Sequence, residues 1–202
     1  MIRCALGRAY LVVALSLVPA AACAHDLSDR YGAFLGAAIH PLISLDHLLA
    51  FLGVGLLAGQ QGTPAARRTV AAFVAGLLLG VVLSTVLPAS PDALRFLGVF
   101  NLASLLVLGA FAAAALRLPL WLVAFLAALF GASHGLENGI DLADALSVLS
   151  ALGVLTAGLV ATAPVAVLVV KLRAGWQRVA VRVAGSWIAA IGLIVLGLRI
   201  AP

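Results

Sequence analysis

Three ionisable side chains stand close together in an otherwise apolar stretch of the chain, residues 31–59. They are His40, Asp46 and His47. Imidazole and carboxylate groups bind divalent transition metals and also carry protons. Ionisable groups are costly at membrane depth, and this stretch is long enough to cross a bilayer. The combination therefore indicates a functional site.

The spacing of the two histidines limits how they can act. On a regular helix His40 and His47 share a face but lie about 10.5 Å apart along the axis. An imidazole nitrogen binds a first-row metal at about 2.0–2.1 Å, so a regular helix does not let both rings hold one ion. Two arrangements remain: the helix is broken between them, or they form two successive stations along a path. Pro41 favours a break, because it cannot donate the amide hydrogen bond to Ala37.

Asp46 also cannot share a site with His40 on a regular helix. It lies about 120° around a regular helix from His40, so it joins a common site only if the backbone deforms. Alternatively, Asp46 faces a neighbouring helix and orients a histidine there.

A second polar cluster lies in residues 131–139, at the expected outer end of a later apolar segment. His134 and Glu137 are three residues apart and share a helix face if the helix persists that far. They again supply an imidazole and a carboxylate. Asn101 and Ser104 form a further polar pair, for which hydrogen bonding between helices is the favoured role and a position facing a pathway is the alternative.

The composition places these residues in a membrane protein. The chain has 202 residues, of which 65% are hydrophobic and 9% charged, and its mean hydropathy is +1.24. A soluble core cannot use so much apolar surface. The formal charge of +5 comes from basic residues that stand singly or in short clusters between apolar blocks. This pattern is typical of residues that set the orientation of membrane helices, and we expect no nucleic-acid partner.

Residues 1–24 have the pattern of a cleavable signal peptide. Arg3 and Arg8 precede a short apolar run, residues 10–18, and a small-residue cleavage site. Cleavage after residue 24 leaves His25 as the mature N-terminus and removes both cysteines. A lipoprotein site at Cys23 is a weaker alternative, because the usual leucine is missing three residues earlier.

The remaining chain, residues 25–202, is expected to form a single all-α transmembrane domain of six helices. The apolar segments are 31–59, 69–87, 96–115, 118–134, 145–170 and 180–199, separated by turn and breaker residues. With the mature N-terminus periplasmic, loops one, three and five and the start of the sixth helix face the cytoplasm. They carry Arg67, Arg68, Arg117, Lys171, Arg173, Arg178 and Arg182 and no acid, whereas the acids of the loops and termini fall on the outer side. We therefore expect a multi-pass protein of the bacterial inner membrane, in contact with the lipid bilayer.

Glycines recur four residues apart in several of these segments. The pairs are Gly32 and Gly36, Gly55 and Gly59, Gly76 and Gly80, and Gly135 and Gly139. This spacing lets membrane helices approach closely, so helix packing is the expected role of most of these pairs.

The assembled motifs resemble the HupE/UreJ family of membrane proteins. The resemblance lies in His40-Pro41-Leu42 with residues 45–50 (LDHLLA), in His134-Gly135 with Glu137, and in the layout of a signal peptide followed by six spans. Two positions differ from the family pattern: Ser44 stands where glycine is common, and Phe130 where an additional histidine is frequent.

The resemblance implies a permease for nickel or cobalt, with the ion as transported substrate and no cofactor required. It implies that His40, Asp46 and His47 are metal-pathway residues. We expect the ion to enter near His134 and Glu137, with His25 as a further candidate ligand. No ATP-binding motif is recognisable, and the protein is not expected to be an enzyme.

Other interpretations remain open. One is a metal-dependent accessory factor or enzyme held in the membrane, and another is a proton-relay protein that moves no metal. The sequence is compatible with an oligomer and with an indirect link to the proteins that mature hydrogenase or urease.

Overall fold

The computed structural model describes residues 24–87 and 90–200, and over these residues the protein is entirely helical. The elements are α2 (Ala24–Ile43), α3 (Leu45–Gln60), α4 (Thr63–Ser84), α5 (Pro91–Ala114), α6 (Leu120–Asp141), the 3-10 turn η2 (Ala143–Ala145), α7 (Val148–Lys171) and α8 (Gly175–Ile200). The all-α fold class is confirmed. The expected signal peptide lies outside the described residues, apart from Ala24.

Five of these helices, α4 to α8, are long and apolar enough to cross a membrane. The first expected span is divided between α2 and α3, which are bent by 79° at a short break. Counted as one broken span, this pair brings the number of spans to six. The protein is therefore a multi-pass membrane protein.

One boundary differs from the sequence-based expectation and bears on the site. The fourth apolar segment was expected to end at residue 134, but α6 continues to Asp141. Gly135 and Gly139 indicated a turn, yet both lie inside the helix and face α4. A Cβ atom at Gly135 would lie 2.2 Å from the carbonyl oxygen of Leu77, so glycine is needed here for helix contact and not for chain reversal.

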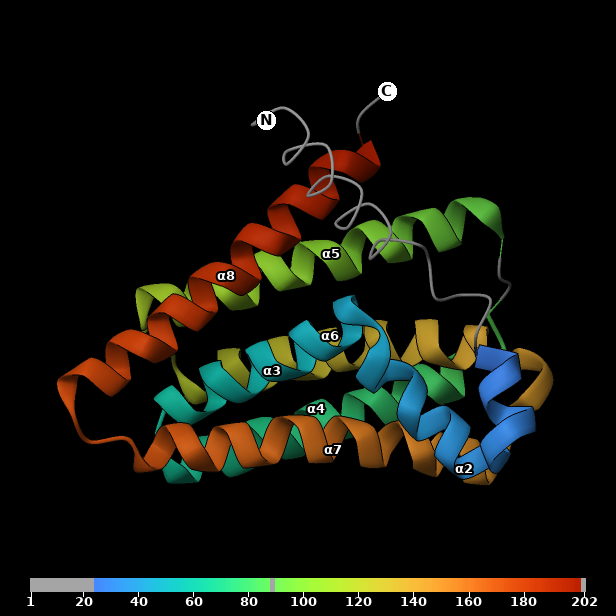
Figure 1. The fold of residues 1–202 in the computed structure, drawn as a ribbon, viewed down its shortest axis with the longest axis horizontal. Coiled ribbons are helices and arrows are strands. Elements are labelled where there is room, and N and C mark those ends of the chain that lie inside the picture. Colours follow the sequence, from blue (N-terminus) through green and yellow to red (C-terminus); the bar gives the residue numbers. More distant parts are fainter. Residues whose placement is uncertain (1–23, 88–89, 201–202) are drawn as a thin grey trace, which may run out of the picture.

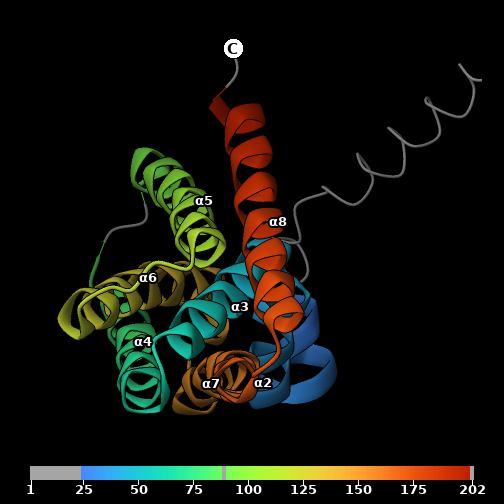
Figure 2. The ribbon, with the colours of Figure 1, turned by 90° about the vertical axis from the view of Figure 1, so that its left-hand side faces the viewer.

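Helix α3 lies at the centre of the molecule. It contacts every other long helix, and ten of its sixteen residues are buried. Seen along the bundle, α2, α4, α5, α6, α7 and α8 surround it (Figure 2). A helix that is apolar on all sides can be stable only in such an enclosed position.

Around α3 the outer helices pack in pairs. The closest pairs are α4 with α6 and α5 with α8, while α7 packs against both α2 and α3. Figure 1 shows α5 and α8 along one side of the molecule and α4 with α7 along the other. The α4–α6 contact depends on glycine, because a Cβ atom at Gly76 or Gly80 would lie about 2 Å from a carbonyl oxygen of α6.

The expected packing role of the glycine pairs holds for α3, α4 and α6. Gly55 and Gly59 lie against α7 in the same way that Gly76 and Gly80 lie against α6. The first pair differs: Gly32 has a φ of 81° and no atom near its missing side chain, so it forms a kink within α2.

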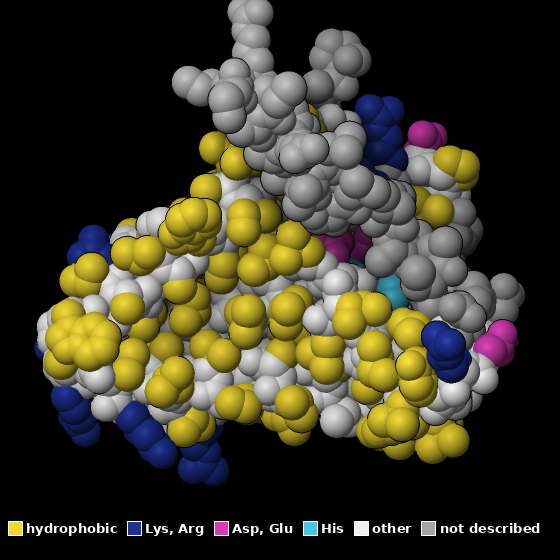
Figure 3. Space-filling view, viewed as in Figure 1, with side chains coloured by type: hydrophobic (Ala, Val, Ile, Leu, Met, Phe, Trp, Pro, Cys, Tyr) yellow, Lys and Arg dark blue, Asp and Glu magenta, His cyan; other side chains and the backbone are white. Residues whose placement is uncertain are grey.

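The two ends of the bundle differ in charge. One end, hereafter the basic end, holds the connections α3–α4, α5–α6 and α7–α8, and among the described residues it carries Arg67, Arg68, Arg117, Lys171, Arg173, Arg178 and Arg182 and no acid. The opposite end, hereafter the acidic end, carries Asp92 and Asp141 together with Arg95 and Arg199. Hydrophobic side chains cover most of the face between them (Figure 3).

Candidate metal site

The break between α2 and α3 occurs at Ser44, three residues after Pro41. Ser44 has φ −78° and ψ 114°, which is extended backbone that a non-glycine residue adopts without strain. Its backbone N–H and its hydroxyl both donate to the carbonyl oxygen of His40, at 3.1 and 2.9 Å. These two bonds close the end of α2, and α3 begins at the next residue.

The bend brings the two histidines of the first motif together. The ring centroids of His40 and His47 are 6.0 Å apart, against about 10.5 Å of axial separation on a regular helix. Both side chains are buried, with 2% of their surface exposed. Of the two arrangements that the sequence left open, the broken helix is the one observed.

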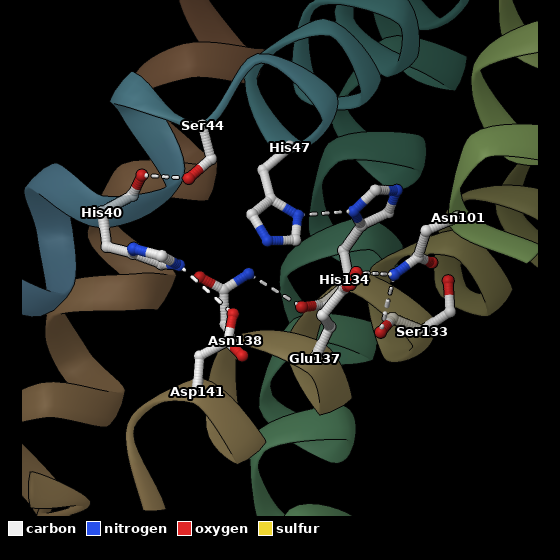
Figure 4. Close-up of polar contacts among 9 residues, drawn as sticks. All are labelled: His40, Ser44, His47, Asn101, Ser133, His134, Glu137, Asn138 and Asp141. Carbon is white, nitrogen blue, oxygen red and sulfur yellow. Dashed lines mark hydrogen bonds and ion pairs between the residues drawn. The ribbon is translucent and has the colours of Figure 1, made fainter. Parts of the chain in front are cut away.

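Helix α6 supplies the other half of the site. Glu137 and Asn138 lie three and four residues after His134, and Asp141 lies seven residues after it, so the four side chains line one face over two turns. His134 and Asn138 are fully buried, whereas Asp141 is 30% exposed at the acidic end. Figure 4 shows this face of α6 turned toward His40 and His47.

Together these helices form two groups of possible metal ligands. The first contains His40, His47 and Asp141, and the second contains His47, His134 and Glu137. Within each group one ligand atom of each residue lies within 4.8 Å of the others. His47 belongs to both groups, and it lies between the other two histidines (Figure 4).

The first group has ring nitrogens available for a ligand. Among the described residues, neither nitrogen of His40 has a hydrogen-bond partner, although Nε2 is 3.4 Å from Oδ2 of Asp141. A buried polar atom without a partner is costly, and an ion between imidazole and carboxylate would remove that cost.

In the second group, a hydroxyl from α5 supports His134. The Ser104 oxygen lies 2.6 Å from the carbonyl oxygen of Asn101 and 3.1 Å from Nε2 of His134. When the hydroxyl donates to Asn101, it accepts from Nε2–H, and His134 keeps its lone pair on Nδ1. That nitrogen faces Nδ1 of His47 at 2.8 Å.

Two amide side chains hold the α6 face in place. Asn101 donates to the Glu137 carboxylate and to the carbonyl oxygen of Ser133, so α5 binds α6 through polar contacts. Asn138 donates to the carbonyl oxygen of His134, at 2.8 Å. Its own oxygen is buried without a partner among the described residues, and it lies between the two ligand groups (Figure 4).

An aromatic layer closes the site on the side of the basic end. Phe51 is one turn beyond His47 on α3, and its ring lies 6.4 Å from His47 and 6.1 Å from His134, centroid to centroid. Phe73 of α4 packs edge-on against Phe51 at 5.2 Å. Both phenylalanines are fully buried. The site is therefore separated from the basic end by packed apolar side chains.

The structure brings together four of the six residues predicted from the sequence: His40, His47, His134 and Glu137. Asp46 lies in the first turn of α3, partly buried, and its carboxylate is outside both ligand groups. It is close enough to His47 and His134 to interact with their charge, so its role in orienting a histidine stays a prediction. His25 is near the start of α2, and its side chain lies outside the described part of the chain.

Asp141 is the ligand candidate that the sequence reasoning missed. It was assigned to a loop, because the glycines before it indicated a turn. The signal was present in its spacing, since Asp141 is seven residues from His134 and four from Glu137. Reading α6 as continuous would have placed all three on one face.

Comparison with known proteins gives one match. The family model described as HupE / UreJ protein matches residues 13–195. Comparisons with curated proteins and with solved structures give no significant match. The matched region includes every element from α2 to α7 and most of α8.

Proposed function

The chain belongs to the HupE/UreJ family, and from this premise we propose that it is an inner-membrane permease for a divalent transition metal. The family is linked to uptake of nickel and cobalt for hydrogenases and ureases, and its members are generally not enzymes. In our proposal the substrate is Ni²⁺ or Co²⁺, and it moves from the periplasm to the cytoplasm.

The observation that carries this proposal is the pair of ligand groups that share His47. Imidazole and carboxylate ligands suit divalent first-row metals. A pathway needs sites that bind well enough to admit an ion and weakly enough to release it. Two groups of three donors that overlap at His47 meet that requirement.

The donor set supports a divalent first-row metal without selecting one. Nδ1 of His47 and Nδ1 of His134 are 2.8 Å apart, which is a hydrogen-bond distance, so an ion held by both rings would replace that bond. Imidazole ligands suit nickel, cobalt and zinc alike, and the choice of nickel or cobalt rests on the family.

The route we propose begins at the acidic end, where Asp141 is partly exposed. It differs from the entry near His134 and Glu137 that the sequence led us to expect, because His134 is fully buried. From Asp141 the ion would pass to His40, then to His47, and then to His134 and Glu137. Beyond them, Phe51 and Phe73 block the way toward the basic end, so in this conformation the site is closed on that side. Hydrophobic constrictions of this kind gate pores by excluding water.

The membrane potential can drive this movement if the basic end is cytoplasmic, as the positive-inside rule predicts. Moving a divalent cation inward at 100 mV gains about 4.6 kcal/mol, twice the value for a single charge. Uniport is therefore energetically feasible without ATP.

The deciding experiment measures uptake of ⁶³Ni into proteoliposomes. Wild-type protein should take up nickel under an inside-negative potential, and His47→Ala should abolish that uptake because it removes a donor from both groups. The matched control is Ser133→Ala, whose hydroxyl bonds only within α6. Uptake by His47→Ala equal to that of the wild type would refute the site.

A proton relay is a second candidate, favoured by one observation. His47, His134 and Ser104 form a continuous hydrogen-bonded chain that ends on the carbonyl oxygen of Asn101. Such chains conduct protons in membrane proteins. Proton flux into metal-free proteoliposomes, without nickel uptake, would favour this function over the permease.

A further inference from the structure

A second polar site lies at the basic end, far from the histidines along α3. It is a pocket of about 220 Å³ between the end of α3, the α5–α6 connection, the end of α7 and the start of α8. Its polar lining is formed by Gln60, Arg117, Arg178 and Arg182. Its apolar lining includes Val169, Val170 and Val181. The pocket is thus charged on one side and apolar on the other.

The charge of this pocket is not balanced by acidic side chains. Seven basic residues stand at this end, and all seven acidic residues of the chain lie in other segments. Among the described residues, no ion pair joins any of the three pocket arginines to a carboxylate. The three arginines line the pocket with their side chains exposed, and guanidinium groups favour an anion as their partner.

The hydrogen bonds of the arginines leave most of their donors free. Arg117 donates to the carbonyl oxygen of Gln60 at 2.7 Å, and Arg182 donates to that of Ala113 at 2.8 Å. These bonds cap the ends of α3 and α5 and hold the two guanidinium groups in place. Arg178 makes only a long bond of 3.4 Å, to Arg173. Each guanidinium has five N–H groups, so each keeps donors for a ligand.

Gln60 adds the complementary group. Its side-chain nitrogen donates to the carbonyl oxygen of Ala112 at 2.9 Å, which fixes the amide. Its side-chain oxygen is buried and has no hydrogen-bond partner among the described residues. A turn of the Gln60 amide would bring that oxygen to a hydroxyl group of a ligand that also carries a negative charge.

The level of the pocket in the membrane is marked by two tryptophans. Trp121 and Trp176, at the starts of α6 and α8, are 70% and 73% exposed. Tryptophan is enriched where the hydrocarbon meets the headgroups. The pocket lies beside these residues in the chain, at the same end of the bundle.

From these observations we propose that the pocket binds the headgroup of an anionic phospholipid of the phosphatidylglycerol type. The phosphodiester would contact the three arginines, the glycerol hydroxyls would face Gln60, and the acyl chains would follow the valines of α7 and α8. Basic pockets between membrane helices on the cytoplasmic side bind such headgroups. The apolar lining favours a lipid over a free phosphate ion. This site is independent of the metal site.

Native mass spectrometry of the full-length protein tests the proposal. The protein is released from micelles containing either phosphatidylglycerol or phosphatidylcholine, and the retained lipid is counted. Wild type should retain phosphatidylglycerol and not the zwitterionic lipid. Arg178→Gln should weaken retention about fivefold, and Arg178→Gln with Arg182→Gln about 25-fold, at about 1 kcal/mol for each hydrogen bond to the phosphate that is lost.

The matched controls are Arg67→Gln and Arg67→Gln with Arg68→Gln. They remove the same charge from the same end but lie in the first turns of α4, away from the pocket. These variants should retain lipid as the wild type does. Because Arg182 caps a helix, its variants are first checked for thermal unfolding, and Arg178→Gln alone suffices if the double variant does not fold.

Three outcomes would overturn the proposal. The first is unchanged retention in the pocket variants, and the second is equal loss in the Arg67 and Arg68 controls, which would show a general surface attraction. The third is displacement of the lipid by millimolar inorganic phosphate, which would identify a free anion as the ligand.

Discussion

Ser104 shows how a residue that binds no metal can determine what a ligand does. When its hydroxyl donates to the carbonyl oxygen of Asn101, it accepts from His134 and holds the proton of that ring on Nε2. As a result, His134 presents a lone pair to His47. Such supporting hydrogen bonds orient metal-binding histidines in many proteins.

Replacing Ser104 by alanine should weaken metal binding without removing a ligand. His134 would lose its partner on α5 and could adopt the other tautomer, in which Nδ1 carries the proton. We expect the apparent affinity for Ni²⁺ in the uptake assay to fall by about 10- to 100-fold. Ser133→Ala is the control, and equal effects of the two variants would contradict this role.

At the scale of elements, the bend at Ser44 determines the distance between His40 and His47. Serine forms the bend here although glycine is common at this position in the family pattern. Alanine and glycine at position 44 both remove the hydroxyl, but they differ by about 1 kcal/mol in helix propensity. A comparison of the alanine and glycine variants therefore measures the effect of backbone conformation at position 44, separate from the loss of the hydroxyl.

We expect Ser44→Ala to transport more slowly than Ser44→Gly, by about fivefold, because alanine favours a straight helix and separates the histidines. The measurement is the initial rate of ⁶³Ni uptake at equal amounts of folded protein. A rate for the alanine variant equal to or above that of the glycine variant would show that the bend is held by packing alone.

The α4–α6 contact is a second element-scale determinant, because it positions His134. A Cβ atom at Gly80 would lie 2.1 Å from the carbonyl oxygen of Ala132. Gly80→Ala should therefore lower the free energy of unfolding by about 1–3 kcal/mol, as overpacking does elsewhere. Thermal unfolding in detergent measures this loss. Gly197→Ala on α8 should show none, since no atom lies within 4 Å of that position.

Much of the element-scale description could be predicted from the sequence. Apolar run lengths predicted the spans, and Pro41 with the seven-residue spacing of the histidines predicted a broken helix or a two-station path. The predicted end of α6 was wrong, because glycines such as Gly135 and Gly139 occur both in turns and in close contacts between helices. Only the position of α4 decides between these two roles, and the sequence does not show that α4 packs against α6.

The composition of the ligand groups could be predicted only in part. His40, His47, His134 and Glu137 stood out as ionisable groups in apolar segments. Their division into two groups, and the addition of Asp141, depend on how α6 packs beside the α2–α3 bend. The roles of Ser104 and Asn101 depend on the approach of α5 in the same way.

At the scale of the whole molecule, the separation of charge between the two ends predicts orientation in the membrane. The basic end should be cytoplasmic and the acidic end periplasmic. Single cysteines test this: in a background with Cys4→Ser and Cys23→Ser, Asp92→Cys should react with an impermeant maleimide in intact spheroplasts. Arg173→Cys should react only after lysis. The reverse pattern would invert the proposed direction of transport.

The membership of His47 in both ligand groups limits the stoichiometry. A neutral imidazole has one lone pair, so His47 can serve one ion at a time. When an ion binds one group, the other group therefore lacks its His47 donor. In the proposed pathway the ion then moves from one group to the other without a second bound ion to displace it. Uptake should accordingly depend on nickel concentration with a Hill coefficient of one. In the proposed pathway, one shared side chain therefore makes transport a one-ion process, in which a second ion cannot bind before the first has left His47.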